Sequence, residues 1–143
     1  MPYRLLDDAP TADVGFVASG DTLDACFQAA ADATLDVMLG NRDALQPRER
    51  RTITVASESV DLALLKFLEE LIFYKDAESL FLRVTLVRVD QRDEQWCVDA
   101  VAEGEPVDPA RHLLAGDVKA VTLHRLGVRH TDAGWEATVV LDI

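Results

Sequence analysis

The residues with the strongest potential for chemistry stand at the end of the sequence. The last three residues are Leu141-Asp142-Ile143, directly after an alternating segment that is typical of a β-strand. The Asp142 side chain and the α-carboxylate of Ile143 would therefore place two negative charges within one residue of each other. An ordered pair of carboxylates needs a positive partner, either a basic side chain or a hard cation bound through oxygen. From these residues alone, a nearby arginine or lysine is the simpler explanation.

The histidines and cysteines form no recognisable catalytic or metal-binding pattern. His112, His124 and His130 lack the spacing of a metal cluster. His124 is expected on a β-strand, where a single histidine is more often a hydrogen-bonded structural residue than a catalyst. Cys26 and Cys97 are far apart and have no CxxC pattern, which indicates two buried thiols in a reducing compartment. Phosphate-loop, GxSxG and HExxH motifs are also absent from the sequence.

The chain is strongly acidic, with 26 acidic and 14 basic residues and a formal net charge of −12. Nucleic-acid binding is driven by lysine and arginine side chains that displace counterions from phosphates, and this sequence lacks such a basic footprint. We therefore expect no direct nucleic-acid binding and favour cations or a basic protein surface as partners. Solubility alone is an alternative explanation of the charge.

Length and hydropathy predict one soluble domain. The 143 residues fit a single domain, 1–143, and 49% of them are hydrophobic, which is normal for a protein that builds a core without disulfides. The first residues show no basic stretch followed by an apolar run, and no apolar segment approaches the length of a membrane helix. We therefore expect no membrane association and a cytoplasmic location.

Two segments have the apolar periodicity of amphipathic helices. The first helix is predicted over residues 22–39 and the second over residues 60–74. Glu69 and Glu70 are neighbours in the second helix. We interpret them as part of a solvated face, because adjacent residues on a helix do not converge on one point.

Alternating apolar residues and β-branched side chains predict six strands. They are expected over residues 14–18, 51–56, 80–89, 95–103, 118–128 and 135–142. Residues 90–93 and 131–134 have the composition of hairpin loops. This arrangement predicts an α+β fold, a single domain in which two long helices pack on a largely antiparallel β-sheet.

Four segments resemble the archease family, in the same order and with fitting separations. Thr11-Ala12-Asp13-Val14-Gly15, followed by a Thr-Leu helix start, is similar to the family's His-Thr-Ala-Asp-hydrophobic-Gly opening. The second helix, LALLKFLEELIFYKD, resembles its Leu-Leu-x-x-Trp-Leu-Asn-Glu-Leu segment. Gly104-Glu105, His112 and the run VKAVTLH resemble a third block, and Leu141-Asp142-Ile143 resembles the family's Leu-Asp-Ile terminus. No single motif is specific, but four collinear motifs are.

Four positions depart from the family pattern. Pro10 stands where the family usually has histidine, and the replacements for tryptophan, asparagine and tyrosine are Phe67, Glu69 and Leu123. None of these changes removes a carboxylate. Pro10 weakens any role for a side chain at that position, and Leu123 puts any role for a hydroxyl there in doubt.

The resemblance implies a metal site. Archeases bind a divalent ion, commonly calcium, through an N-terminal aspartate, the penultimate aspartate and the last residue. These positions correspond here to Asp13, Asp142 and Ile143. Because the two aspartates are far apart in the sequence, the early strand would have to lie beside the last one. Without the resemblance, Asp13 is interpreted as a turn or capping residue before Gly15.

The resemblance also implies a function that is not itself catalytic. Archeases activate an RNA-splicing ligase, which joins a 3′-phosphate or cyclic-phosphate end to a 5′-hydroxyl end, by promoting ligase guanylylation and multiple turnover in tRNA splicing or RNA repair. Two alternatives remain. A metal-dependent hydrolase would need a general base, and no clear base stands beside Asp13 or Asp142 in the sequence. A chaperone-like protein-binding module would act without a ligase.

Overall fold

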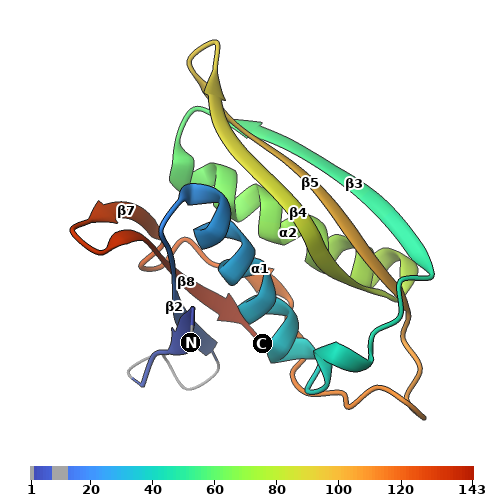
Figure 1. Cartoon of the computed structure of the whole chain (residues 1–143). Helices are drawn as coiled ribbons and strands as arrows, with labels where there is room; N and C mark the ends of the chain where they lie inside the picture. The colour runs from blue at the N-terminus through green and yellow to red at the C-terminus, as the bar shows by residue number, and fades with distance from the viewer. Residues whose placement is uncertain (1, 8–12) are drawn as a thin grey trace.

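Two antiparallel sheets lie on either side of two long helices in the structure, a computed structural model that describes residues 2–7 and 13–143 (Figure 1). Both α1 (Leu23–Met38) and α2 (Val60–Glu78) contact strands of both sheets. α1 accordingly buries apolar residues on several of its sides, as a helix enclosed by other elements must. The predicted α+β class is confirmed, and the strands are divided between two sheets.

Side-chain caps fix where both helices begin. Thr22 Oγ1 accepts a hydrogen bond from the Ala25 N–H at 3.1 Å, and Ser59 Oγ accepts one from the Leu62 N–H at 3.0 Å. α1 agrees with its predicted range to within one residue at each end. α2 continues four residues past its predicted end and stops where Ser79 takes a left-handed conformation, with φ of 52°. Within the described residues, no helix combines the length and apolarity that a membrane crossing requires.

The larger sheet contains both the first and the last strand of the chain. Its strand order is β1-β2-β8-β6, and β7 also pairs with β8. β2 pairs with β8 over its whole length, so the first and last predicted strands are neighbours. The bounds of these strands are β1 (Tyr3–Leu5), β2 (Asp13–Gly20), β6 (Ala120–Val121), β7 (Gly127–Thr131) and β8 (Gly134–Asp142).

The smaller sheet has the order β3-β5-β4, with its strands bounded as β3 (Glu49–Ser57), β4 (Leu80–Arg92) and β5 (Gln95–Pro106). A short 3₁₀ turn, η1 (Arg42–Ala44), precedes it. The β4–β5 hairpin turns at Asp93 and Glu94, with φ values of 51° and 64°. Two successive positive φ values are typical of a two-residue hairpin turn. Because such a turn needs only two residues, β4 continues to Arg92, through most of the loop predicted at 90–93. The hairpin predicted at 131–134 is confirmed.

The prediction of one strand over residues 118–128 is wrong. The segment forms two short strands, β6 and β7, which pair with different parts of β8. Val121 is opposite Leu141 and Gly127 is opposite Thr138, so six steps along this segment cover only three along β8. The extra residues leave the sheet in a turn that contains His124 and is exposed. The predicted strand position of His124 is therefore also wrong.

One cluster of buried apolar side chains joins both helices to both sheets. Within it, the Phe27 and Phe67 rings stack with centroids 6.0 Å apart. Cys26 is buried, as predicted, and burial raises the pKa of its thiol to about 11. The prediction of a buried thiol is wrong for Cys97, which is only half-buried. Strand alternation places Cys97 on the opposite face of β5 from the buried Val98.

Candidate metal centre

The pairing of β2 with β8 sets two aspartates opposite each other. Asp13, the first residue of β2, is the register partner of Asp142, the last residue of β8. Paired residues of antiparallel strands project from the same face, with Cβ atoms about 5 Å apart. The prediction that the early strand lies beside the last one is confirmed. Two carboxylates far apart in the sequence are therefore neighbours in the fold.

β6 holds Asp142 from the other side. Ala120 is its register partner there, and the Lys119 N–H donates to the Asp142 carbonyl at 2.8 Å. The Ile143 side chain packs against the hydrophobic core. The end of β8 thus has a strand on each side and an apolar anchor, so the main chain beside Asp142 has a defined position.

The two aspartates lie on the face of the sheet that is turned away from α1. Phe16 and Ala18 of β2 are buried on the helix side, so alternation places Asp13 and Gly15 on the other face. A Cβ atom at Gly15 would stand 2.8 Å from Leu6 Cδ1, so the glycine leaves room for Leu6 to cover this face. Both aspartates are half-buried. The motif residues at positions 10–12 lie outside the described residues.

Neither aspartate has a basic partner within residues 2–7 and 13–143. In that part of the chain, no lysine, arginine or histidine side chain forms an ion pair with Asp13 or Asp142. Like charges directly opposite each other destabilise a strand pair. The sequence left open that a lysine or arginine neutralises these carboxylates. No such basic partner is present among the described residues.

A buried hydroxyl lies on the neighbouring strand edge. Thr122 Oγ1 is buried and has no hydrogen-bond partner within the described chain. The Thr122 N–H donates to the Val140 carbonyl at 2.9 Å, and Val140 lies two residues before Asp142 on the same face of β8. No three His, Cys, Asp or Glu side chains of the described residues converge on one point. The polar side chains here are oxygen donors, which suit a hard cation better than zinc.

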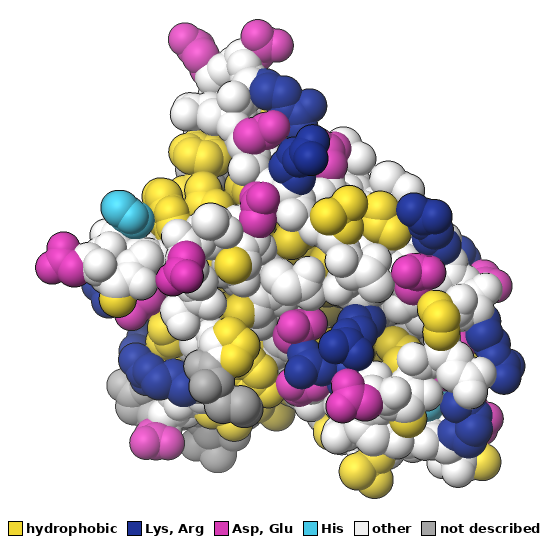
Figure 2. Space-filling view, in the orientation of Figure 1, with side chains coloured by type: hydrophobic (Ala, Val, Ile, Leu, Met, Phe, Trp, Pro, Cys, Tyr) yellow, Lys and Arg dark blue, Asp and Glu magenta, His cyan; other side chains and the backbone are white. Residues whose placement is uncertain are grey.

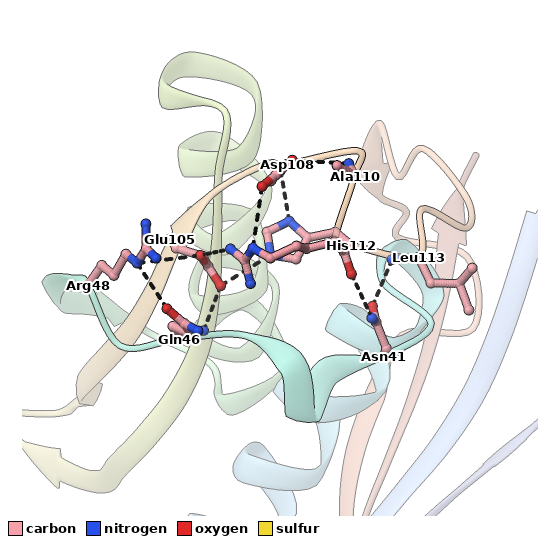
Figure 3. Close-up of polar contacts among 9 residues, drawn as sticks. Asn41, Gln46, Arg48, Glu105, Asp108, Ala110, His112 and Leu113 are labelled. Atoms are coloured by element: carbon pink, nitrogen blue, oxygen red, sulfur yellow. Dashed lines mark hydrogen bonds and ion pairs between the residues drawn. The ribbon is translucent and has the colours of Figure 1, made fainter.

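A second polar cluster surrounds Glu105, whose side chain is 1% exposed (Figure 3). Its Oε2 atom accepts a hydrogen bond from the Gln46 N–H at 2.7 Å and lies 3.2 Å from His112 Nε2. Its Oε1 atom pairs with Arg111 and lies 3.8 Å from Arg48 Nε. Burial by itself raises the pKa of Glu105. Its partners, above all the Gln46 amide, lower the pKa by more than burial raises it, so the net pKa falls to about 2. Glu105 is therefore ionised near neutral pH and cannot serve there as a general acid.

The same cluster fixes the state of His112. Its Nδ1 atom accepts a hydrogen bond from the Asp108 N–H at 2.9 Å, so Nδ1 carries no proton and the ring proton is on Nε2, facing Glu105. The ring also packs edge-on against Phe81, with centroids 5.8 Å apart. Both ring nitrogens are thus turned to groups of the chain itself. His112 ties the segment after β5 to the smaller sheet and is a structural residue.

Gly104, Glu105 and His112, which belong to the third block of the family resemblance, therefore have structural roles in the fold. A Cβ atom at Gly104 would stand 1.7 Å from the Phe81 carbonyl oxygen, so only glycine fits this close approach of β4 and β5. Glu105 and His112 follow as the buried pair. Sequence patterns alone did not predict this cluster. A glutamate directly after Gly104, just beyond the strand predicted over residues 95–103, and followed closely by Arg111 and His112, was the available signal.

The other histidines have no place in either cluster. His124 lies in the exposed turn between β6 and β7. His130 of β7 is the register partner of Trp135, and the two rings lie 4.7 Å apart between centroids. Such a cross-strand aromatic pair stabilises a hairpin.

The fold and the paired aspartates define a small two-sheet α+β protein with a candidate hard-cation site, and comparison with known proteins identifies its family. The archease protein family (MTH1598/TM1083) matches residues 3–143. A protein archease from Pyrococcus abyssi is 35% identical over 93% of this chain and 94% of its own. One from Methanopyrus kandleri is 34% identical over 100% of both chains. The chain belongs to the archease family.

Solved structures share the fold. The solution structure of Methanobacterium thermoautotrophicum protein 1598 has a TM-score of 0.85 and 31% identity, and the match covers 99% of both chains. A crystal structure of TM1083 from Thermotoga maritima, described as an archease and possible chaperone, has a TM-score of 0.60 and 15% identity. The latter match covers 94% of this chain and 93% of that one, and it supports the fold alone.

Proposed function

We propose that this chain is a metal-binding protein cofactor that activates an RNA-splicing ligase and does not itself catalyse a reaction. The observation that carries the proposal is the direct opposition of Asp13 and Asp142, without a basic partner in the described chain. Membership of the archease family supplies the functional context. Two adjacent carboxylates that no basic side chain of the described residues neutralises are the expected feature of a cation site.

In this proposal, Asp13, Asp142 and the α-carboxylate of Ile143 hold one divalent cation, with Ca²⁺ as the preferred ion. The donor set fits, because hard cations favour carboxylate oxygens and the register brings two of them to one point. The bound ion supplies positive charge that relieves the repulsion between the aspartates. Three carboxylates around one dication leave a charge of about −1 at this end of the sheet.

The negative charge suggests how the protein meets its partner. An acidic end is attracted to a basic, metal-containing active site of a ligase, and the net charge of −12 steers the approach. Contact at that active site would promote formation of the ligase–guanylate intermediate and support multiple turnover. The role of this chain is then to bind and position, and the ligase performs the chemistry.

Calcium should stabilise the protein through the paired aspartates. At about 100 times its dissociation constant, a ligand adds about 2.7 kcal/mol to the free energy of unfolding. We expect a corresponding upward shift in a thermal-shift titration and a binding signal in calorimetry. Asp13→Ala and Asp142→Ala should remove both, whereas Asp132→Ala, at the exposed tip of the β7–β8 hairpin, should retain both. Unchanged calcium binding by the first two variants would show that the site assignment is wrong.

The isolated protein should bind RNA weakly. Figure 2 shows acidic side chains interspersed among the basic ones on the face in view, without a continuous basic patch. The densest basic segment of the sequence contains Arg48, Arg50 and Arg51, and Arg51 is already paired with Glu49 and Glu78. A titration with tRNA at physiological salt should therefore show little binding. Tight binding with a steep salt dependence would contradict the proposal.

Direct assays distinguish the proposed function from the two alternatives, a metal-dependent hydrolase and a chaperone-like module. A metal-dependent hydrolase needs a general base at the metal, and no histidine or cysteine joins Asp13 and Asp142 in a group of three among the described residues. Metal-dependent turnover of a substrate by the purified chain alone would favour the hydrolase. Binding to unrelated unfolded proteins, without any effect on a cognate ligase, would favour the chaperone-like module.

A further inference from the structure

The two edges of the smaller sheet differ in how their main-chain groups are satisfied. Along β4, the Gln28 Nε2 atom donates to the Val84 carbonyl at 2.8 Å, and the Asp24 carboxylate accepts from the Val89 N–H at 2.7 Å. Both side chains come from α1, and the β4 register also shifts between Val84 and Leu86. Side chains and bulges of this kind prevent another strand from pairing. The β4 edge is therefore closed.

The β3 edge is covered only toward its two ends and has no bulge. Near its start, the Arg51 guanidinium donates to the Arg50 carbonyl at 2.9 Å. The Lys66 Nζ atom donates to the Ala56 carbonyl at 2.8 Å, which places this carbonyl on the side away from β5. Because alternate residues of an antiparallel strand direct their main-chain groups the same way, those of Thr52 and Thr54 also point away from β5. Within the described chain, no other segment hydrogen-bonds to them, and both side chains are exposed. Figure 1 shows β3 at the margin of its sheet.

We propose that this edge pairs with a second copy of the same chain, antiparallel and about a twofold axis at Ile53. In that register Thr52 lies opposite Thr54 of the partner subunit, so the outward main-chain groups of both residues meet their complements. Threonine pairs are favourable across antiparallel strands. β3 contains no proline, glycine or bulge that would interrupt the pairing.

Charge also favours self-association in this register. Arg48, just before β3, falls opposite Glu58 of the partner subunit, just after it. The Arg48 side chain is 63% exposed, and Glu58 is exposed and has no ion pair within the described chain. The twofold axis forms this contact twice. Within β3 no like charges are register partners, because Arg50 and Arg51 meet Ala56 and Val55 of the partner subunit.

Two exposed apolar side chains of α2 line the same edge. Leu62 is 40% exposed and Phe73 is 54% exposed, and helical spacing places both on one stripe with Lys66, which contacts β3. The Phe73 ring contacts Tyr74, and Arg51 lies 5.7 Å from the centre of the Tyr74 ring. Phe73 therefore lies near the first half of β3, whereas Leu62 follows its end. The twofold axis would bring Phe73 toward Leu62 of the partner subunit and cover both.

Self-association can be measured on the intact protein by sedimentation or light scattering. The unmodified chain should reach twice its mass of 15.7 kDa as its concentration rises. Thr54→Pro removes an outward N–H and leaves the β3–β5 pairing intact, so this variant should remain folded at 15.7 kDa. Phe73→Lys should also remain folded as a monomer, and it leaves the strand itself unchanged. Leu86→Lys is the matched control, because Leu86 is 61% exposed on the other face of the same sheet; this variant should still dimerise.

Amide hydrogen exchange provides a second measurement. The Thr52 and Thr54 amides should become protected as the concentration of the unmodified chain rises. A mass of 15.7 kDa into the millimolar range would overturn the proposal, as would a dimer that survives both Thr54→Pro and Phe73→Lys. Protection of these amides only when a ligase is added would assign the edge to a different protein and likewise overturn self-association. Because β3 and the paired aspartates are on different sheets, none of these results depends on metal binding.

Discussion

A chain extended beyond Ile143 should lose its stimulation of a cognate RNA ligase and keep its fold. One added residue converts the proposed carboxylate ligand into a peptide carbonyl, which removes a full charge and obstructs the end of the sheet. Leu141 and the inward face of β8 are unchanged, so thermal stability without metal should be nearly unaffected. Stimulated guanylylation and ligation should fall to the level of the ligase alone. The assay compares both reactions with and without this protein.

Matched variants test the same prediction from other directions. Asp142→Ala should have the same effect as the extension, because it removes the neighbouring ligand. An equally long extension at the N-terminus should have much less effect, since Asp13 lies well inside the chain. Full stimulation by the C-terminally extended protein would rule out the terminal carboxylate as a functional ligand. No stimulation by the unmodified protein would sink the ligase-activator function and leave the protein-binding module.

Among substitutions of charged side chains, Glu105→Ala should lower the free energy of unfolding the most. It leaves the Gln46 N–H without its acceptor and removes the carboxylate that lies 3.2 Å from the buried His112 Nε2. Among the described residues, Arg111 keeps only Asp108 as an ion-pair partner. Breaking a buried network by removing one member costs about 3 kcal/mol or more. Urea unfolding should show the loss as a lower midpoint with an unchanged slope. Glu103→Ala is the control, since this residue lies on the outer face of the same strand and should change stability by about 0.5 kcal/mol at most.

The same carboxylate should shape the stability of the protein in acid. The pKa of Glu105 is lowered from 4.5 to about 2 in the folded chain, so its contribution to stability is fully present above about pH 4.5. It is lost as the pH falls through about 2, where the folded carboxylate is protonated. In Glu105→Gln the decline in stability across this window should be shallower than in the unmodified chain. Parallel declines in both proteins would show that Glu105 does not carry this dependence.

Local patterns in the sequence determined the helices. Residues 22–39 and 60–74 have a 3.6-residue apolar period, and caps at Thr22 and Ser59 start the helices where that period begins. The strand over 118–128 was mispredicted for a related reason. Its apolar residues have strand character throughout, but pairing with β8 decides where the strand is interrupted, and local character contains no information about that partner. The division into two sheets depends on the same non-local pairing.

The candidate sites divide in the same way. The sequence by itself determined which residue types are available: an acidic chain, a carboxylate-rich end and a block containing Glu105 and His112. The tertiary structure decided which of these residues meet. The antiparallel register of β2 with β8 brings Asp13 to Asp142, and the close approach of β4 to β5 at Gly104 builds the buried cluster at Glu105. Composition and periodicity act over a few residues, whereas a site is made by pairing between segments that are distant in the chain.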